Sequence, residues 1–161
     1  MAFHCRVMRT VYCCSKATVS LNKIGSFIAL QKIHDISMGT SCSTRPIFAR
    51  MVNSFGMSMH ERLVTHVKGG TTPMTLVADA STDHGNLHHV TLLLQAIEDN
   101  VPVTYFYGLV EIKKESAEEQ KNAILKAFEQ DDLLEVMAKR IIALVTDGAA
   151  VICNLTEINH Y

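Results

Sequence analysis

The sequence has almost no net charge, no long apolar run and no regular spacing of cysteines, and each absence excludes a class of protein. A formal net charge of −1 over 161 residues gives no bulk electrostatic argument for nucleic-acid binding. No apolar run approaches the roughly 20 residues that a membrane-spanning helix needs, so we expect no membrane partner. His4, Arg6 and Arg9 interrupt the N-terminal segment, which lacks the apolar core of a secretory signal. We therefore expect an intracellular protein.

Cysteine and histidine are scattered along the chain. The five cysteines are odd in number and none are spaced as CxxC: Cys5, Cys13, Cys14, Cys42 and Cys153. In a reducing compartment this pattern predicts free thiols and not a disulfide scaffold or a structural zinc site. His84, His88 and His89 are close in sequence, but a strand would send His88 and His89 to opposite faces. With no fourth ligand nearby, we do not expect these histidines to bind metal.

The composition is that of a globular protein, and the first part of the chain is predicted to be helical. Hydrophobic residues make up 48 % of the chain and charged residues 19 %, which suits one ordinary domain with a sizeable core. Helices are predicted over residues 6–16 and 23–34. A longer helix is predicted after Thr44 and Pro46, which favour a helix start. Its core-facing stripe is expected to comprise Phe48, Met51, Val52, Phe55, Met59 and Leu63.

After Pro73 the pattern changes to strands. Residues 69–73 contain Gly-Gly and Pro, so they are expected to link a helical region at 1–68 to a domain at 74–161. Strands are predicted at 74–78, 88–97 and 101–112, the last two as a hairpin. A helix should follow, with Ser116 and Glu119 as its capping box, and then a strand at 141–145. Because 74–78 and 141–145 are short and continuously apolar, we expect adjacent, parallel, buried strands with the hairpin on the far side of 74–78. The fold class is therefore α/β.

Two acidic residues follow these apolar runs. Asp79 follows one run and Asp147 the other. Adjacent parallel strands would present both carboxylates at one edge of the sheet, where open α/β sheets bind ligands. Mg²⁺ prefers such hard oxygen ligands and often takes one or two carboxylates with water and substrate phosphate. The alternative is that each Asp caps a turn. Asp83 is a weaker candidate for the site, because it lies in a Ser-Thr-Asp-His-Gly turn where a local hydrogen-bonding role explains it.

Several phrases in order resemble hAT-family transposases and their zinc-finger-protein relatives. VADASTD at 77–83 resembles the family's (A/F)DESTD motif, and LVTDGAA at 144–150 resembles its DGA phrase. FYGLVEI at 106–112 is similar to the FLGFVEL-like strand between them. IALQK at 28–32, together with RTVY at 9–12, is similar to the helical region before the core. The resemblance covers most of residues 6–155.

The resemblance implies a partial ribonuclease-H-like mixed sheet preceded by a helical region. It places Asp79 as the first acid, on the first strand, and Asp147 as the second, after the fourth strand. These are the two residues whose carboxylates we expect to reach one shared Mg²⁺. The family usually has Glu where this chain has Ala80, and its third acid, a distant Glu, has no counterpart before Tyr161. We therefore expect a truncated or domesticated transposase-derived protein that is nuclear by resemblance and inactive alone as a nuclease. The alternatives are a protein-interaction module that uses the fold as a scaffold, and residual Mg²⁺-dependent binding of DNA. Self-association through the outer edge of 141–145 is a further expectation.

Overall fold

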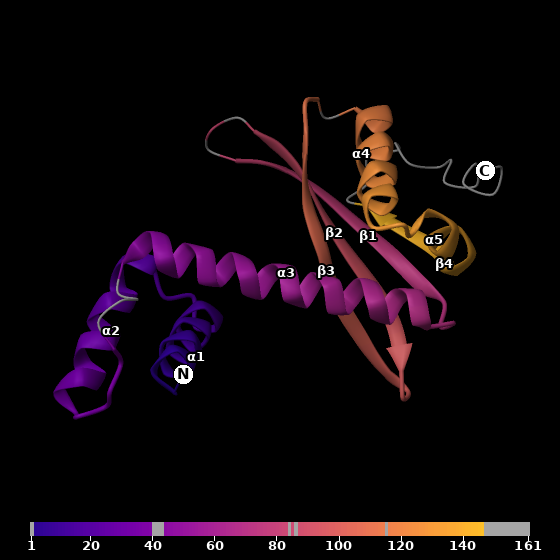
Figure 1. Cartoon of the computed structure of the whole chain (residues 1–161). Helices are drawn as coiled ribbons and strands as arrows, with labels where there is room; N and C mark the ends of the chain where they lie inside the picture. The colour runs from indigo at the N-terminus through magenta and orange to yellow at the C-terminus, as the bar shows by residue number, and fades with distance from the viewer. Residues whose placement is uncertain (1, 40–43, 84, 86, 115, 147–161) are drawn as a thin grey trace. The chain divides into compact units, whose positions relative to one another are not determined.

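The computed structural model describes residues 2–39, 44–83, 85, 87–114 and 116–146 (Figure 1). These residues form two compact units, Met1–Glu61 and Arg62–Tyr161, and the boundary between the units falls inside one long helix. Helices occupy the first unit and a four-stranded mixed sheet the second, which is the α/β class predicted, with a helical region before the sheet. Each unit is described in turn.

The first unit contains α1 (Ala2–Lys16), α2 (Leu21–Ile33) and the first part of α3 (Arg45–Gly69). Tyr12 and Phe55 meet edge to face with ring centroids 5.7 Å apart, which joins α1 to α3. The buried side chains form one cluster: Val7, Val11, Cys14, Ile24, Ile28, Met38 and Phe48. This cluster is the hydrophobic core of the helical unit.

Two helices bury fewer of their apolar side chains than their sequences contain. In α2, Ile24 and Ile28 are buried, whereas Phe27 is 43 % exposed and Ile33 75 % exposed. In α3, Phe48 is buried as predicted, but Met59 is 61 % exposed. Apolar residues occur on several sides of both helices, so their spacing does not by itself identify the side that meets the core.

The sheet of the second unit has the strand order β3-β2-β1-β4. Its strands are β1 (Met74–Thr82), β2 (His88–Glu98), β3 (Val101–Ile112) and β4 (Ile141–Thr146). β1 pairs in parallel with β4 and antiparallel with β2, and β2 pairs antiparallel with β3. The predictions that 74–78 and 141–145 are adjacent and parallel, and that the hairpin lies beyond 74–78, are confirmed.

A two-residue turn closes the β2–β3 hairpin. Asp99 and Asn100 both have positive φ, at 49° and 62°. Positive φ at both central residues defines the type I′ turn, whose twist matches that of the flanking strands, and Asp and Asn tolerate it better than most residues. The local sequence thus fixes the register of the hairpin.

Helices cover one face of the sheet. α4 (Ala117–Gln130) and α5 (Leu134–Arg140) lie over it, and Val67 near the end of α3 joins the same core (Figure 1). Ser116 caps α4 by accepting a hydrogen bond from the backbone N–H of Glu119 at 3.3 Å, which confirms the Ser116 half of the predicted capping box. The buried core of this face combines strand and helix residues: Met74, Leu76, Ala78, Val90, Leu92, Leu94, Ala96, Tyr107, Ile112, Ile124, Phe128, Leu133 and Met137.

The expectation that 141–145 is buried throughout is wrong. Leu144 packs against the core, but Val145 is 49 % exposed and Ile142 is 73 % exposed. Ile142 is the extra residue of a bulge, since Met74 pairs with Ile141 and Thr75 with Ala143. A parallel strand is buried on both faces only where layers cover both. Among the described residues, β4 is packed on its helix-facing side and occupies one edge of the sheet.

Candidate functional site at Asp79 and the edges of the sheet

Asp79 lies inside β1, which continues beyond it to Thr82. Met74, Leu76 and Ala78 are buried toward the helices, so strand alternation turns Asp79 to the opposite face, where it is exposed. Its Cα partner on β2 is Thr91. Among the described residues, the Asp79 carboxylate is therefore accessible to a solvated ligand on the face of the sheet opposite α4 and α5.

The second predicted acid, Asp147, lies outside the residues that the structure describes. The parallel register pairs Ala78 with Thr146, the last described residue of β4. Asp79 follows Ala78 directly in the sequence, and Asp147 follows Thr146. The prediction that their carboxylates reach one shared cation remains a prediction.

Asp83 has the local hydrogen-bonding role expected of a turn residue. Its Oδ1 accepts hydrogen bonds from the backbone N–H groups of Gly85 at 2.8 Å and Leu87 at 2.9 Å. The bond from Leu87 is the main cause of a lowered Asp83 pKa, with the nearby His89 adding to it. Oδ2 lies 3.8 Å from Nε2 of His89. Asp83 thus organises the β1–β2 connection.

The neighbouring histidines are divided between partners. Nδ1 of His88 is 2.9 Å from the hydroxyl of Thr82, whereas His89 approaches Asp83. Within the part of the chain that the structure describes, no three His, Cys, Asp or Glu side chains are grouped so as to hold a metal ion. Asp79 alone offers one hard oxygen ligand group, which would need a second carboxylate or a substrate phosphate to hold Mg²⁺.

Sequence reasoning missed a polar cluster at the far end of the sheet. Oε1 of Glu98 lies 2.7 Å from Nε2 of His66, and Oε2 accepts a hydrogen bond of 2.7 Å from the Tyr105 hydroxyl. The bond from Tyr105 is the largest cause of a lowered Glu98 pKa, followed by the bond with His66. His66 and Glu98 are 32 residues apart, so no motif links them.

A second missed residue is Arg140, at the end of α5. It is buried, and its guanidinium donates to the carbonyl oxygens of Val67 and, at 2.8 Å, of Thr72. Gly70 lies so close that an added Cβ would be 3.1 Å from Nη1 and Nη2. Burial lowers the Arg140 pKa. Arg140 therefore satisfies a terminal carbonyl of α3 and binds the connection to β1.

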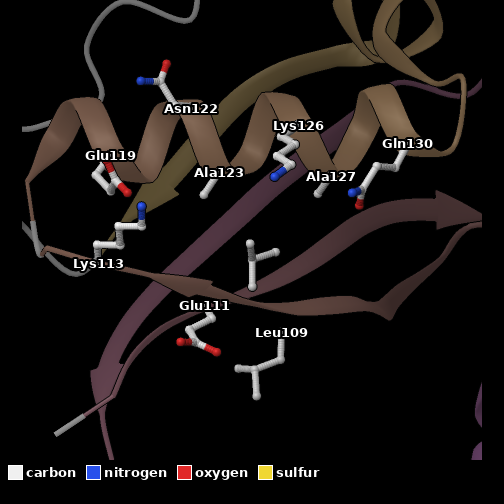
Figure 2. Close-up of a pocket in the computed structure, with 10 residues that line it drawn as sticks. Leu109, Glu111, Lys113, Glu119, Asn122, Ala123, Lys126, Ala127 and Gln130 are labelled. Atoms are coloured by element: carbon white, nitrogen blue, oxygen red, sulfur yellow. The ribbon is translucent and has the colours of Figure 1, made fainter.

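The described residues also form a groove of about 480 Å³ between β3 and α4 (Figure 2). Figure 2 shows Ala123 and Ala127 directed from α4 toward the strand, with Leu109 and Glu111 on the strand's opposite side. The other labelled residues that line the groove carry polar or charged side chains: Lys113, Glu119, Asn122, Lys126 and Gln130. The groove does not include Asp79.

Comparison of the chain with protein-family models, curated proteins and solved structures finds no match. In the described parts of the chain, no helix combines the length and apolar character needed to cross a bilayer.

Proposed function

We propose that this chain is a hAT-like, transposase-derived protein with a ribonuclease-H-like core, and that the 161 residues alone do not form a competent nuclease. Asp79 and Asp147 then correspond to the family's first and second acids. The proposal includes a nuclear location and an ancestral relationship to DNA.

The strand arrangement is the observation that carries this proposal. The resemblance implies a first acid on the first strand and a second acid after the fourth strand. In this sheet β1 and β4 are neighbours and run parallel. β1 and β4 therefore run toward the same end of the sheet, and the exposed Asp79 lies on the face that the described helices leave open.

The donor chemistry of Asp79 suits Mg²⁺, because its carboxylate is exposed and Mg²⁺ prefers oxygen ligands with several waters retained. Asp147 would be the second carboxylate. A bound Mg²⁺ would stabilise the charge that develops on phosphate oxygens in phosphoryl transfer. Ala80 stands where the family usually has Glu, so this segment supplies fewer acidic groups than the family motif. This loss supports weak metal binding and no nuclease activity.

The test is Mn²⁺ binding, measured by electron paramagnetic resonance as the free ion signal disappears. If the proposal holds, Asp79→Asn and Asp147→Asn each weaken binding, and the double variant is no weaker than either one, because both carboxylates hold one ion. Asp83→Asn is the matched control and should leave binding unchanged. Additive effects of the two substitutions would show separate surface sites and would remove the shared site from the proposal.

Activity is tested on the same proteins. Mg²⁺- or Mn²⁺-dependent cleavage of DNA that contains transposon-like ends should be absent. Cleavage by the wild-type chain that disappears in both Asp79→Ala and Asp147→Ala would show a working enzyme and would contradict the proposed inactivity.

The second candidate function is a protein-interaction module on the same scaffold. The observation that favours it is the exposed apolar set on the face opposite the helices, which includes Ile97 at 65 %, Phe106 at 62 % and Leu109 at 56 % exposure. Apolar side chains grouped on one surface are typical of interaction sites. Cross-linking of the purified chain should then be concentrated on β2 and β3.

A further inference from the structure

The outer edge of β3 and the side of α4 enclose the groove of Figure 2. β3 is the last strand of the described sheet and pairs there only with β2. An edge strand presents backbone N–H and C=O groups that a further strand can pair. In this molecule the stretch from Leu109 to Lys113 forms one wall of the groove, so its backbone edge and the groove are adjacent.

Helix α4 supplies the other wall, with small side chains where a strand would need room. Glu119, Ala123 and Ala127 are spaced by four residues and lie on one face of the helix. Figure 2 shows Ala123 and Ala127 directed at the space beside β3. Both alanines, with Val110, pack against the edge of the core. Side chains that entered here would therefore meet an apolar floor.

We propose that this groove binds an extended peptide segment of a partner protein, which adds to β3 as a fifth strand beside α4. The backbone of the peptide pairs with the edge of β3 at the usual strand separation of about 4.8 Å. Alternate side chains of the peptide are apolar and enter the space lined by Val110, Ala123 and Ala127. This inference does not depend on descent from a transposase.

The negative charge of Glu111, on the other face of β3, determines which peptide side chains are favoured on that face. Glu111 is exposed, and Figure 2 shows it directed away from α4. Side chains directly opposite each other on adjacent strands interact, and opposite charges are favourable. The peptide therefore carries a basic residue beside Glu111 and an apolar residue beside the exposed Leu109. The preferred sequence alternates apolar residues toward α4 with a basic residue on the outer face.

β3 of a second copy does not fit this groove. Its own helix-facing residues are already buried, with Tyr107 3 % and Ile112 4 % exposed. They cannot leave their core to fill the groove of another molecule without a large loss of buried apolar area. A free peptide segment has no such cost, which is why the groove favours a partner strand over self-pairing.

The test begins with a phage-displayed library of random peptides selected on the whole immobilised chain. Selected peptides are labelled with fluorescein, and binding is measured by fluorescence anisotropy. Single N-methylation along each peptide gives the specific signature. Strand addition predicts that methylation at alternate positions weakens binding about tenfold or more, while methylation at the intervening positions is tolerated.

Variants of the chain locate the site. Ala127→Arg fills the groove and should weaken binding at least about tenfold, with circular dichroism to verify folding. Glu111→Lys is at an exposed position and should weaken peptides with a basic residue there, and replacing that basic residue with glutamate should restore binding. Glu129→Lys, on an exposed part of α4 outside the groove, is the matched control and should change nothing.

Three results would overturn the inference. One is a library that yields no peptide preferring the wild-type chain to folded Ala127→Arg. Another is N-methylation that is tolerated everywhere or harmful everywhere, because neither pattern fits a strand. The third is sedimentation that shows a dimer which Glu111→Lys dissociates and selected peptides do not, since a second copy would then occupy the edge.

Discussion

The hydroxyl of Tyr107 donates a hydrogen bond of 2.5 Å to Oδ2 of Asp131 and lies 3.1 Å from the carbonyl oxygen of Ala127. Tyr107 is the extra residue of a bulge in β3, since Leu92 pairs with Gly108 and Leu93 with Phe106. Its ring meets Phe128 with centroids 5.1 Å apart. The bulge thus turns a tyrosine into the core and binds β3 to the C-terminal end of α4.

The first prediction is that Tyr107→Phe destabilises the second unit. The substitution keeps the ring packing but removes a buried hydrogen bond to a carboxylate, so the free energy of unfolding should fall by about 1–3 kcal/mol. Urea unfolding followed by circular dichroism measures it. Tyr12→Phe is the control, because Tyr12 is 45 % exposed and should change stability by less than about 0.5 kcal/mol.

The contact between Tyr107 and Asp131 also predicts that stability responds to alkaline pH. Burial, and then the bond to Asp131, raises the pKa of Tyr107 above its ordinary value of 10.0. A raised folded pKa stabilises the fold below the unfolded pKa, and the stabilisation is lost as pH rises above that value. The wild-type chain should therefore lose stability relative to Tyr107→Phe above about pH 10. A stability difference between the two proteins that stays constant across pH 9–11 would contradict this assignment.

Arg140→Met should loosen the end of α3 where it meets β1. The substitution keeps an apolar side chain but leaves the carbonyl oxygens of Val67 and Thr72 without the guanidinium. A loss of about 1–3 kcal/mol is expected, with faster amide exchange around residues 66–72. Lys139→Met, at an exposed position beside it, should change neither quantity appreciably. Equal effects of both substitutions would mean that charge, and not these hydrogen bonds, matters.

Local patterns in the sequence predicted most of the sheet. The apolar runs on either side of the hairpin and helix gave the parallel pairing of β1 with β4, because such runs are typical of strands that pack against helices. The Ser116–Glu119 pair predicted the start of α4, because an N-cap serine accepts its hydrogen bond from a backbone N–H within one turn. The helix start depends on neighbours in the sequence, and the strand pairing on the apolar character of each run.

Features that depend on distant residues could not be predicted. The bulges at Tyr107 and Ile142 depend on the register of paired strands, and Arg140 contacts residues about 70 positions away in the chain. In the candidate site, the sequence associated Asp79 with the strand that begins at Met74. It did not predict that Asp79 lies exposed within that strand, which continues to Thr82. The meeting of Asp79 with Asp147 is untested, because Asp147 lies outside the described residues.

Acidic pH should remove the contribution of the Glu98 carboxylate to the stability of the fold. Its pKa is lowered first by the Tyr105 hydrogen bond and then by His66, from an ordinary value of 4.5. A lowered folded pKa gives stability that is present above the unfolded pKa and is lost as pH falls through the folded value. Glu98→Gln should therefore be less stable than the wild-type chain at pH 7, and the difference should shrink below about pH 4.5. Glu118→Gln, on the exposed first turn of α4, should show no such narrowing.

Two phenylalanines test which face of the sheet is covered. Phe128 on α4 is fully buried against the sheet, and Phe106 on β3 is 62 % exposed. Phe128→Ala removes a buried ring and leaves a cavity, so the free energy of unfolding should fall by about 3–5 kcal/mol. Phe106→Ala should change it by about 0.5 kcal/mol or less, because its ring gains little burial on folding. Urea unfolding at several protein concentrations separates the remaining possibilities. A large cost for Phe106→Ala that is independent of concentration would show that another part of the chain covers this face. A cost that grows with concentration would show that a second copy covers it.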